Sequence, residues 1–230
     1  KTRSLPRYGC LNLYASMLPA YRGASPVTAA ILRGDRSTGV SLMVMEPGLG
    51  TGPVVDRVTV PIADDDTTAS LTERLGFAAA GLSRSSIDRF VRGELVPELQ
   101  EATGATRTRP LIKADGWLDW SQSAVQLERR IRAMWPWPRA WTTLNGAPLQ
   151  IHAATVLSLH PMSPPGAVDL VSGDPIVGCG DGALRLEVVQ MAGGKPTSGR
   201  AWVAGRHIAQ GTVLGLTGAP SAPPGLIEAV

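Results

Sequence analysis

Residues 11–26 of this chain read LNLYASMLPAYRGASP, a segment dense in chemically active side chains. Tyr14 stands there between the polar side chains of Asn12 and Ser16, and the run SMLP begins at Ser16. Taken alone, SMLP is typical of a turn after a strand, with its two central apolar residues packed in the core. The segment therefore predicts a strand that leads directly into a turn.

The neighbouring sequence extends this segment into an α/β pattern. Ser25 can cap a helix, and Gly34 can end it. Residues 40–45 and 54–62 are rich in β-branched and long apolar residues, and the glycines and proline between them predict a loop. Apolar residues then recur at helical spacing over residues 64–93, which predicts a long amphipathic helix.

A different pattern follows. Residues 100–120 are polar and turn-rich, which is typical of a linker. Ser123 and Gln126 can form a capping box for a helix that Pro136 ends. Beyond it, short alternating stretches separated by Gly, Pro and Asp predict a small β-barrel or sandwich. The predicted strands cover residues 149–159, 174–180, 183–192 and 212–218, and residues 161–166 predict a loop.

Composition limits the classes of protein to consider. Of the 230 residues, 43% are hydrophobic and 18% are charged, and the formal net charge is +3. This composition is that of a globular protein, and no apolar run is long enough to cross a membrane. The small charge neither requires nor excludes nucleic acid. Cys10 and Cys179 have no metal-binding or redox spacing, so we expect two buried thiols in a reducing compartment.

Several long segments resemble the methionyl-tRNA formyltransferase family, in the family's order and over nearly the whole chain. Residues 9–55 contain GCLNLYASMLPAYRGASP and GLGTG, where the family pattern is roughly GCINVHASLLPRYRGAAP followed by GLDTG. Residues 112–142 and 180–199 resemble the start and a later strand pair of its C-terminal domain. The resemblance implies the later half of a Rossmann-like α/β formyltransferase domain, followed by a small β-barrel (OB-like) domain.

By this resemblance, residues 1–104 are a partial catalytic domain, residues 105–120 a linker and residues 121–230 a tRNA-binding domain. The earlier half of the Rossmann-like sheet, which helps to wall the folate pocket, is not represented. We therefore expect an incomplete sequence with an exposed strand edge and an exposed apolar face.

The resemblance implies a transferase that moves a formyl group from 10-formyltetrahydrofolate to the amino group of methionine on initiator tRNA. The amine attacks the formyl carbon, negative charge gathers on the formyl oxygen, and a proton leaves the nitrogen. In the family an asparagine amide donates to that oxygen, a histidine serves the proton, and the aspartate of GLDTG orients the histidine. The matching positions here are Asn12, Tyr14 and Gly50.

Two of these three positions depart from the family pattern. A phenol ionises near pH 10, against about 6.5 for imidazole, so Tyr14 is a hydrogen-bond donor and a poor base at neutral pH. Gly50 offers no carboxylate. Loss of a positioned acid–base group typically lowers a rate roughly 10²–10⁴-fold, so we expect impaired activity. Two alternatives stay open: a non-catalytic tRNA- or folate-binding relative, and a formyltransferase that acts on a nucleotide sugar.

The resemblance also assigns binding residues. The folate loop of the family corresponds to Ser16, Met17, Leu18 and Pro19. Basic side chains are candidates for tRNA phosphate contacts, with a solvated surface as the alternative for each. These are Arg22, Arg129, Arg130, Arg132, Arg139 and Lys195, together with Arg107, Arg109 and Lys113 of the linker. The tryptophans near the linker are expected to pack between the domains rather than to stack on bases.

The expected partners and location follow from the same resemblance. His152, His160 and His207 have no ligand spacing, so we expect no metal. We expect a protein of the bacterial cytoplasm, with an organelle as the alternative. It should bind initiator methionyl-tRNA and the folate co-substrate but no membrane, and be monomeric at full length.

Overall fold

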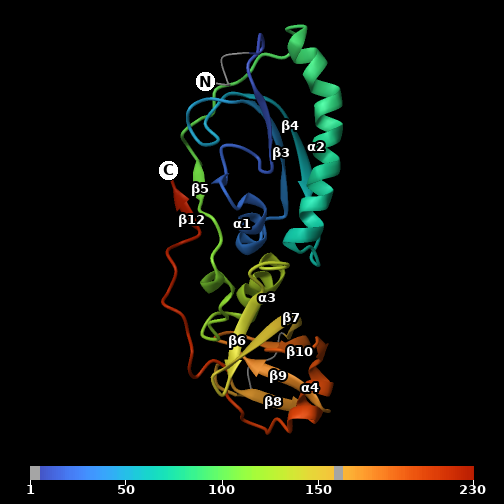
Figure 1. The fold of residues 1–230 in the computed structure, drawn as a ribbon, viewed down its shortest axis with the longest axis vertical. Helices are drawn as coiled ribbons and strands as arrows, with labels where there is room; N and C mark the ends of the chain where they lie inside the picture. Colours follow the sequence, from blue (N-terminus) through green and yellow to red (C-terminus); the bar gives the residue numbers. More distant parts are fainter. Residues whose placement is uncertain (1–5, 158–162) are drawn as a thin grey trace. The chain divides into compact units, whose positions relative to one another are not determined.

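The computed structural model describes residues 6–157 and 163–230. The chain forms two compact units, coloured along the sequence in Figure 1. Unit 1 comprises Lys1–Leu111 together with Gly225–Val230, and unit 2 comprises Ile112–Pro224. The end of the described chain therefore belongs to the same unit as its beginning.

Unit 1 contains a three-stranded antiparallel sheet in the order β1-β3-β4. β1 is Leu11–Tyr14, β3 is Ser37–Val44 and β4 is Val54–Pro61. The strands predicted at 40–45 and 54–62 are therefore confirmed to within a few residues. Among the described residues β1 pairs only with β3, so it forms the expected edge of this sheet.

Two helices accompany this sheet, and both were predicted. α1 is Pro26–Arg33, and Gly34 ends it in the left-handed conformation with φ of 72°. The role expected of Ser25 is wrong, because its hydroxyl donates to the carbonyl of Arg109 at 2.9 Å and caps no helical N–H. α2 is Thr68–Val91 and lies along β3 and β4 (Figure 1). Its leucines Leu71, Leu75 and Leu82 are buried.

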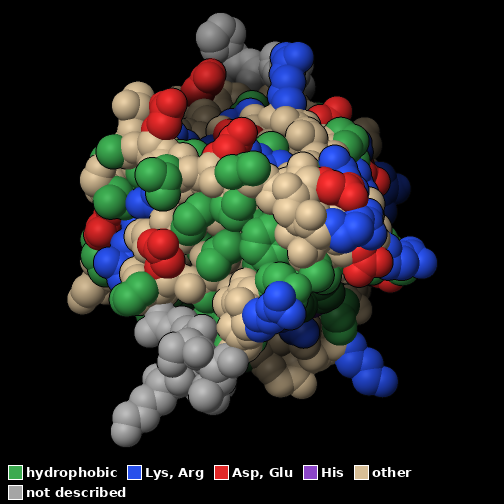
Figure 2. Space-filling model, turned by 90° about the horizontal axis from the view of Figure 1, so that it is seen from above, with side chains coloured by type: hydrophobic (Ala, Val, Ile, Leu, Met, Phe, Trp, Pro, Cys, Tyr) green, Lys and Arg blue, Asp and Glu red, His purple; other side chains and the backbone are tan. Residues whose placement is uncertain are grey.

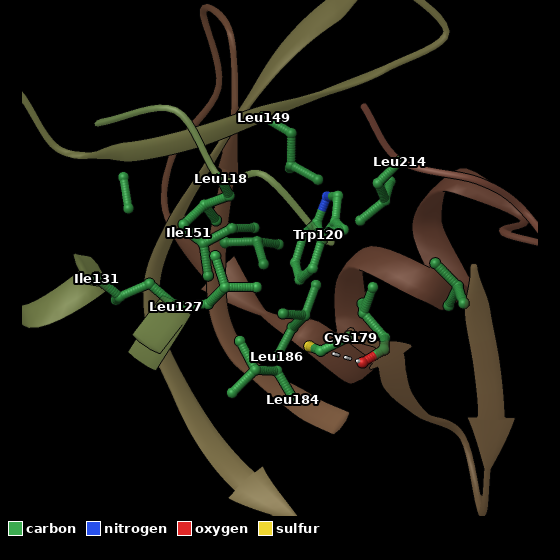
Figure 3. Close-up of a cluster of buried hydrophobic side chains, with 14 of the residues drawn as sticks. Leu118, Trp120, Leu127, Ile131, Leu149, Ile151, Cys179, Leu184, Leu186 and Leu214 are labelled. Atoms are coloured by element: carbon green, nitrogen blue, oxygen red, sulfur yellow. Dashed lines mark hydrogen bonds between the residues drawn. The ribbon is translucent and has the colours of Figure 1, made fainter. Parts of the chain in front are cut away.

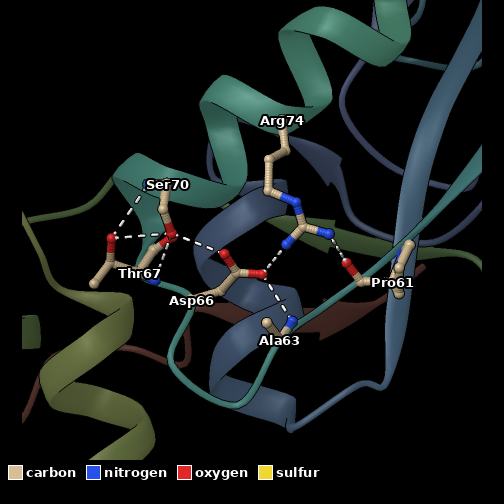
Figure 4. Close-up of polar contacts among 6 residues, drawn as sticks. All are labelled: Pro61, Ala63, Asp66, Thr67, Ser70 and Arg74. Carbon is tan, nitrogen blue, oxygen red and sulfur yellow. Dashed lines mark hydrogen bonds and ion pairs between the residues drawn. The ribbon is translucent and has the colours of Figure 1, made fainter.

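A buried carboxylate holds the loop before α2. Asp66 is 5% exposed and accepts hydrogen bonds from the Ala63 N–H and the Ser70 hydroxyl, both at 2.8 Å (Figure 4). The Arg74 guanidinium binds the same carboxylate and also donates to the Pro61 carbonyl at 2.6 Å. Burial raises the pKa of Asp66, but the hydrogen bonds outweigh it and hold the pKa below its ordinary value. Asp66 therefore joins the end of β4 to the first turns of α2.

A second small sheet of unit 1 has the order β12-β5-β2. β2 is Arg22–Gly23, β5 is Thr106–Thr108 and β12 is Ile227–Ala229. β5 runs parallel to β2 and antiparallel to β12. It lies within the segment expected to be a linker, and its three residues carry no apolar pattern that could have predicted a strand.

Unit 2 is built on a six-stranded sheet with the path β6-β7-β10-β9-β8, with β11 added to β10. Its strands are β6 Ala140–Leu144, β7 Ala147–Leu157, β8 Val168–Val171, β9 Asp174–Gly178, β10 Ala183–Met191 and β11 Thr197–Ser198. Its helices are η2 Lys113–Gly116, which is a 3₁₀ helix, α3 Ala124–Ala133 and α4 Gly199–Arg206. The chain thus has the expected mixed α/β content, while the sheet path of the described residues is open rather than a closed barrel.

Most elements predicted for unit 2 are present. The capping box of Ser123 and Gln126 is confirmed at the start of α3, and three predicted strands correspond to β7, β9 and β10. The strand predicted at 212–218 is wrong, because only Val213 forms a bridge, to Ala167, and Gly215 takes φ of 76°. The end of the strand predicted at 149–159 and part of the loop at 161–166 lie outside the described residues.

The core of unit 2 packs α3 and the sheet around Trp120 (Figure 3). Leu127 and Ile131 of α3 meet Ile151, Leu184 and Leu186 of the strands. The Trp120 indole N–H donates to the Thr142 hydroxyl at 3.2 Å, so its polar group is satisfied inside the core.

The two cysteines differ from each other. Cys179 is buried in this core, and burial raises the pKa of its thiol to about 12. Cys10 is partly exposed, so the expectation of burial is right for only one of the two thiols.

Large apolar side chains are exposed mainly in unit 1, including Phe77, Val96 and Leu99. Figure 2 shows hydrophobic side chains gathered on one face, with arginine and lysine side chains beside them. None of the described helices is both long enough and apolar enough to cross a bilayer. The apolar surface expected from the sequence is therefore present.

We predict that Asp66→Asn lowers the free energy of unfolding by about 1–3 kcal/mol at pH 7, because an amide cannot accept all the hydrogen bonds that the carboxylate accepts. The pKa of Asp66 is lowered in the folded state, so its contribution is present above the ordinary aspartate pKa of about 3.9 and is lost as the pH falls through the folded pKa. Urea unfolding at several pH values measures this difference.

Asp65→Asn is the matched control, because Asp65 is the exposed neighbour of Asp66. Its unfolding free energy should stay within about 0.5 kcal/mol of the parent. Equal effects of the two variants would show that the carboxylate of Asp66 does not hold the loop.

Candidate functional site

Asn12 and Tyr14 share one face of β1. Side chains two residues apart on a strand point to the same side, so both leave the sheet together. In the pairing with β3, Asn12 lies opposite Met43 and Tyr14 lies opposite Ser41. The Tyr14 ring packs against the buried cluster of Leu18, Met43 and Val54. The strand therefore supplies one wall of a site at its edge.

The turn after β1 is held by one buried hydroxyl. Ser41 donates from Oγ to the carbonyl of Ser16 at 2.8 Å and accepts from the Leu18 N–H at 3.1 Å. The Ser16 hydroxyl donates in turn to the Ala20 carbonyl at 2.7 Å. Ser16 and Leu18 are fully buried, whereas Met17 and Pro19 are partly exposed. The turn is thus rigidly placed, and its contact with folate stays a prediction.

Position 50 faces Tyr14. Gly50 has φ of 69°, and a Cβ there would lie 3.7 Å from Cε2 of Tyr14 and 3.4 Å from Cγ of Arg22. These are ordinary contact distances, so a side chain at position 50 would point at both residues. The structure therefore brings Tyr14 and Gly50 together, with Asn12 on the same strand face.

Gln100 connects Arg22 to the loop that contains Gly50, a role that its sequence did not predict. Its Oε1 accepts from Nε and Nη2 of Arg22 at 3.2 and 2.8 Å. Its Nε2 donates to the carbonyls of Gly50 and Gly52 at 2.8 and 2.7 Å. Gln100 lies in the turn-rich segment that was expected to be a linker, and no local signal marks a residue whose partners are 48 to 78 positions away.

This network changes the interpretation of Arg22. The residue is 9% exposed, and its guanidinium is directed to Gln100. The geometry gives no support for a contact between Arg22 and a tRNA phosphate. Arg22 instead places a buried positive charge beside Tyr14 and Gly50.

The hydroxyl of Tyr14 already has a partner. It donates to the Gly23 carbonyl at 2.5 Å, which joins β1 to β2. Burial raises the pKa of Tyr14 and outweighs the lowering effect of the neighbouring Arg22 charge. At neutral pH the phenol is therefore protonated and engaged as a donor, so it is poorly suited to accept a proton from a substrate.

The basic residues predicted to contact tRNA have different surroundings. Arg130 donates to the Asp115 carbonyl at 2.7 Å, and its Nε is buried without a hydrogen-bond partner. Arg132 pairs with Glu128 one helical turn away. Arg129 is partly exposed and Lys195 is exposed. Arg130 and Arg132 are partly exposed as well, but each is engaged within unit 2.

The histidines do not assemble a metal centre in the part of the chain that is described. His152 lies beside Trp135, with ring centroids 5.2 Å apart, and His207 ends α4 in the left-handed conformation. His160 lies outside the described residues. Within residues 6–157 and 163–230, no group of three or more His, Cys, Asp or Glu residues could hold a metal ion.

Two family models match the chain. Residues 3–83 match the model described as formyl transferase, and residues 110–207 match the model described as formyl transferase, C-terminal domain. The first match contains Asn12, Tyr14 and Gly50, and the second contains most of unit 2.

Curated relatives cover most of the chain. It is 42% identical over 212 residues to the methionyl-tRNA formyltransferase of Magnetococcus marinus, which is 92% of this chain and 67% of the relative. It is 45% identical over 193 residues to that of Stutzerimonas stutzeri, which is 84% of this chain and 61% of the relative. The chain thus spans roughly two thirds of the length of these relatives.

Solved structures share the fold at lower identity. An N-formyltransferase from Helicobacter canadensis, solved with folinic acid and dTDP-3-aminofucose, has a TM-score of 0.64 at 18% identity and covers 79% of this chain and 65% of its own. A methionyl-tRNA formyltransferase from Clostridium thermocellum has a TM-score of 0.51 at 21% identity and covers 64% of this chain and 63% of its own. At these identities the matches concern the fold alone.

We predict that Tyr14→Phe lowers the free energy of unfolding by about 0.5–1.5 kcal/mol at pH 7, because it removes the hydrogen bond to Gly23 and keeps the ring. The pKa of Tyr14 is raised in the folded state, so this contribution is present below the ordinary tyrosine pKa of about 10 and is lost as the pH rises through the folded pKa. Denaturant unfolding measures the difference.

Tyr8→Phe serves as the control, since the Tyr8 ring is 45% exposed. It should leave the unfolding midpoint unchanged. If Tyr14→Phe were equally neutral, the bond to Gly23 would contribute nothing to holding β1 and β2 together.

Proposed function

The chain belongs to the methionyl-tRNA formyltransferase family, and we propose that it transfers a formyl group from 10-formyltetrahydrofolate to the amino group of methionyl initiator tRNA. The observation that carries the proposal is the arrangement of Asn12, Tyr14 and position 50 around one end of β1. That arrangement matches the order of the family motif within a chain 42% identical to a curated relative.

In this proposal Asn12 stabilises the transition state. Its side-chain amide would donate to the formyl oxygen as negative charge develops there, and such a positioned donor contributes typically about 3–4 kcal/mol. The folate co-substrate supplies the activated formyl group. The turn from Ser16 to Pro19, held by Ser41, would frame the folate and keep the formyl carbon near Asn12.

Proton removal is the weak step. Tyr14 is protonated at neutral pH and donates to Gly23, and position 50 has no carboxylate to orient a base. The attacking amine would have to lose its proton to solvent, which forgoes roughly 10²–10⁴-fold of rate. We therefore propose slow transfer as the activity of this chain.

The second unit would hold the tRNA. We propose that it is an OB-like module, a proposal supported by its antiparallel six-stranded sheet. Arg129 and Lys195 are favoured as phosphate contacts over Arg22, Arg130 and Arg132, because Arg129 is partly exposed, Lys195 is exposed, and neither side chain has a hydrogen bond or ion pair among the described residues. Arg22, Arg130 and Arg132 are weaker candidates, since each is engaged within the chain. We further propose a monomer at full length, acting in the bacterial cytoplasm.

A non-catalytic tRNA- or folate-binding role is the second candidate. The engagement of the Tyr14 hydroxyl by Gly23 favours it, because that bond gives the phenol a structural role. A formyltransferase acting on a nucleotide sugar is less favoured, since the curated relatives above 40% identity are tRNA formyltransferases. Formylation assays with each acceptor separate the three.

We predict that Tyr14→His combined with Gly50→Asp raises the single-turnover rate of Met-tRNA formylation by roughly 10²–10⁴-fold. An aspartate tolerates the left-handed conformation at position 50 better than most residues. Its Cβ would be in ordinary contact with residue 14 and Arg22, so the carboxylate could orient the new imidazole.

Tyr14→His combined with Gly50→Asn is the matched control, because asparagine has the same shape without the charge. Most of the gain should be absent in that variant. Equal rates for both double variants would contradict the role given to the carboxylate, and no gain in either would defeat the assignment of roles at positions 14 and 50.

A further inference from the structure

The outer side of β6 and β7 carries aromatic and cationic side chains. Leu149 and Ile151 face the core of unit 2, so alternation along β7 turns Gln150 and His152 to the other side. Trp141 of β6 lies directly opposite Gln150 and therefore shares that outer face. Trp141, Gln150 and His152 are all partly exposed.

Two cations lie against the rings of this face. The guanidinium carbon of Arg139 is 5.0 Å from the centre of the Trp135 ring, and its Nη1 donates to Gln150 at 3.1 Å. Nζ of Lys113 is 5.8 Å from the centre of the Trp141 ring. Trp135 also packs against His152, with the two ring planes tilted by 56°. These contacts form one connected surface across the start of β6 and the adjacent part of β7.

Trp137 adds an indole with little burial. It lies in the loop between Trp135 and Arg139, and 56% of its surface is exposed. An exposed tryptophan leaves a large apolar ring in water, which is unfavourable unless a partner covers it. We define Lys113, Trp135, Trp137, Arg139, Trp141 and His152 as the tryptophan face.

The charge of the tryptophan face is positive. Neither Arg139 nor Lys113 pairs with a carboxylate within the described residues, although Arg132 and Arg200 of the same unit do. Burial and the neighbouring Arg139 lower the pKa of His152, so at neutral pH the charge comes from Arg139 and Lys113. Aromatic rings thus lie together on one surface with cations that have no carboxylate partner among the described residues.

We propose that the tryptophan face binds unpaired RNA nucleotides, with Trp137 as a stacking platform and Arg139 and Lys113 as phosphate contacts. Bases stack on exposed aromatic rings whatever their sequence, and cations beside the rings follow the phosphate backbone. The proposal rests on the proposed function in one respect, that the RNA is the methionyl-tRNA substrate.

A protein partner fits this surface less well. A protein partner of this surface would be apolar or acidic. Lys113 and Arg139 already lie over the faces of two tryptophan rings, so an apolar partner would have to compete with them for those faces. A nucleotide offers a ring to the indole and a phosphate to the cation at the same time. Arg139 and Lys113 are among the basic residues that the sequence offered as phosphate contacts, whereas Arg130 and Arg132 from the same set are engaged within unit 2.

The test measures binding by the whole chain to a labelled single-stranded RNA of about 12 nucleotides, a length within the range such surfaces cover. A blunt RNA duplex and initiator methionyl-tRNA are measured alongside. We expect Trp137→Ala to weaken binding of the single strand and of the tRNA roughly 5- to 100-fold and to leave duplex binding unchanged. Arg139→Gln should weaken all three and reduce the salt dependence by about one phosphate contact.

Leu216→Ala and Arg200→Gln are the matched controls, because Leu216 is exposed elsewhere in unit 2 and Arg200 is an exposed arginine paired with Asp174. Both should bind RNA as the parent does. The unfolding midpoint of each variant establishes that the fold is kept.

Several results would overturn the proposal. Parent-like single-strand binding by Trp137→Ala would do so, as would a parent chain that binds no single strand. A change of oligomeric state in Trp137→Ala with unchanged RNA affinity would identify a protein interface instead. These binding assays need no formyl donor, so loss of RNA binding in the variants would support the tryptophan face even if no version of the chain formylates tRNA.

Discussion

The antiparallel pairing of β1 with β3 is the constraint on which the candidate site depends. It places Asn12 and Tyr14 on one face, and it brings Ser41 under the turn that follows β1. Because side chains alternate along a strand, a shift of one residue would turn both site residues to the opposite face. The same shift would remove the Ser41 hydroxyl from the carbonyl of Ser16 and the N–H of Leu18. One register therefore fixes both the face that carries Asn12 and Tyr14 and the turn beside it.

The electrostatics of the site differ in kind from the family pattern. That pattern has a carboxylate at position 50, whereas here a buried guanidinium is held by the neutral amide of Gln100. Two nitrogens of Arg22 donate to Gln100, but in the described part of the chain no carboxylate balances its charge. A positive site of this kind stabilises negative charge and opposes the formation of an imidazolium-like cation. The two departures from the motif therefore act together. Without an aspartate at position 50, a histidine at position 14 would have no carboxylate to stabilise its protonated form.

Local signals predicted the elements that are locally determined. α1, α2 and α3 have caps and apolar periodicity within their own sequences, and their bounds agree with the structure to within a few residues. β5 and Gln100 could not be predicted, because their partners lie far away in sequence and TRT carries no apolar pattern. The motif placed Tyr14 and Gly50 together, but the bond from Tyr14 to Gly23 depends on where β2 lies, which no spacing records.

The pairing of β12 with β5 has a consequence for synthesis of the chain. Residues 225–230 follow all of unit 2 in sequence, yet Ile227 packs against the buried Tyr21 cluster and Val230 donates to the Ala105 carbonyl at 3.2 Å. A ribosome releases the N-terminal segments first, so β2 and β5 are made before their third strand, which follows unit 2 in the sequence. Unit 1 can therefore be completed only after unit 2 and residues 225–230 have been synthesised.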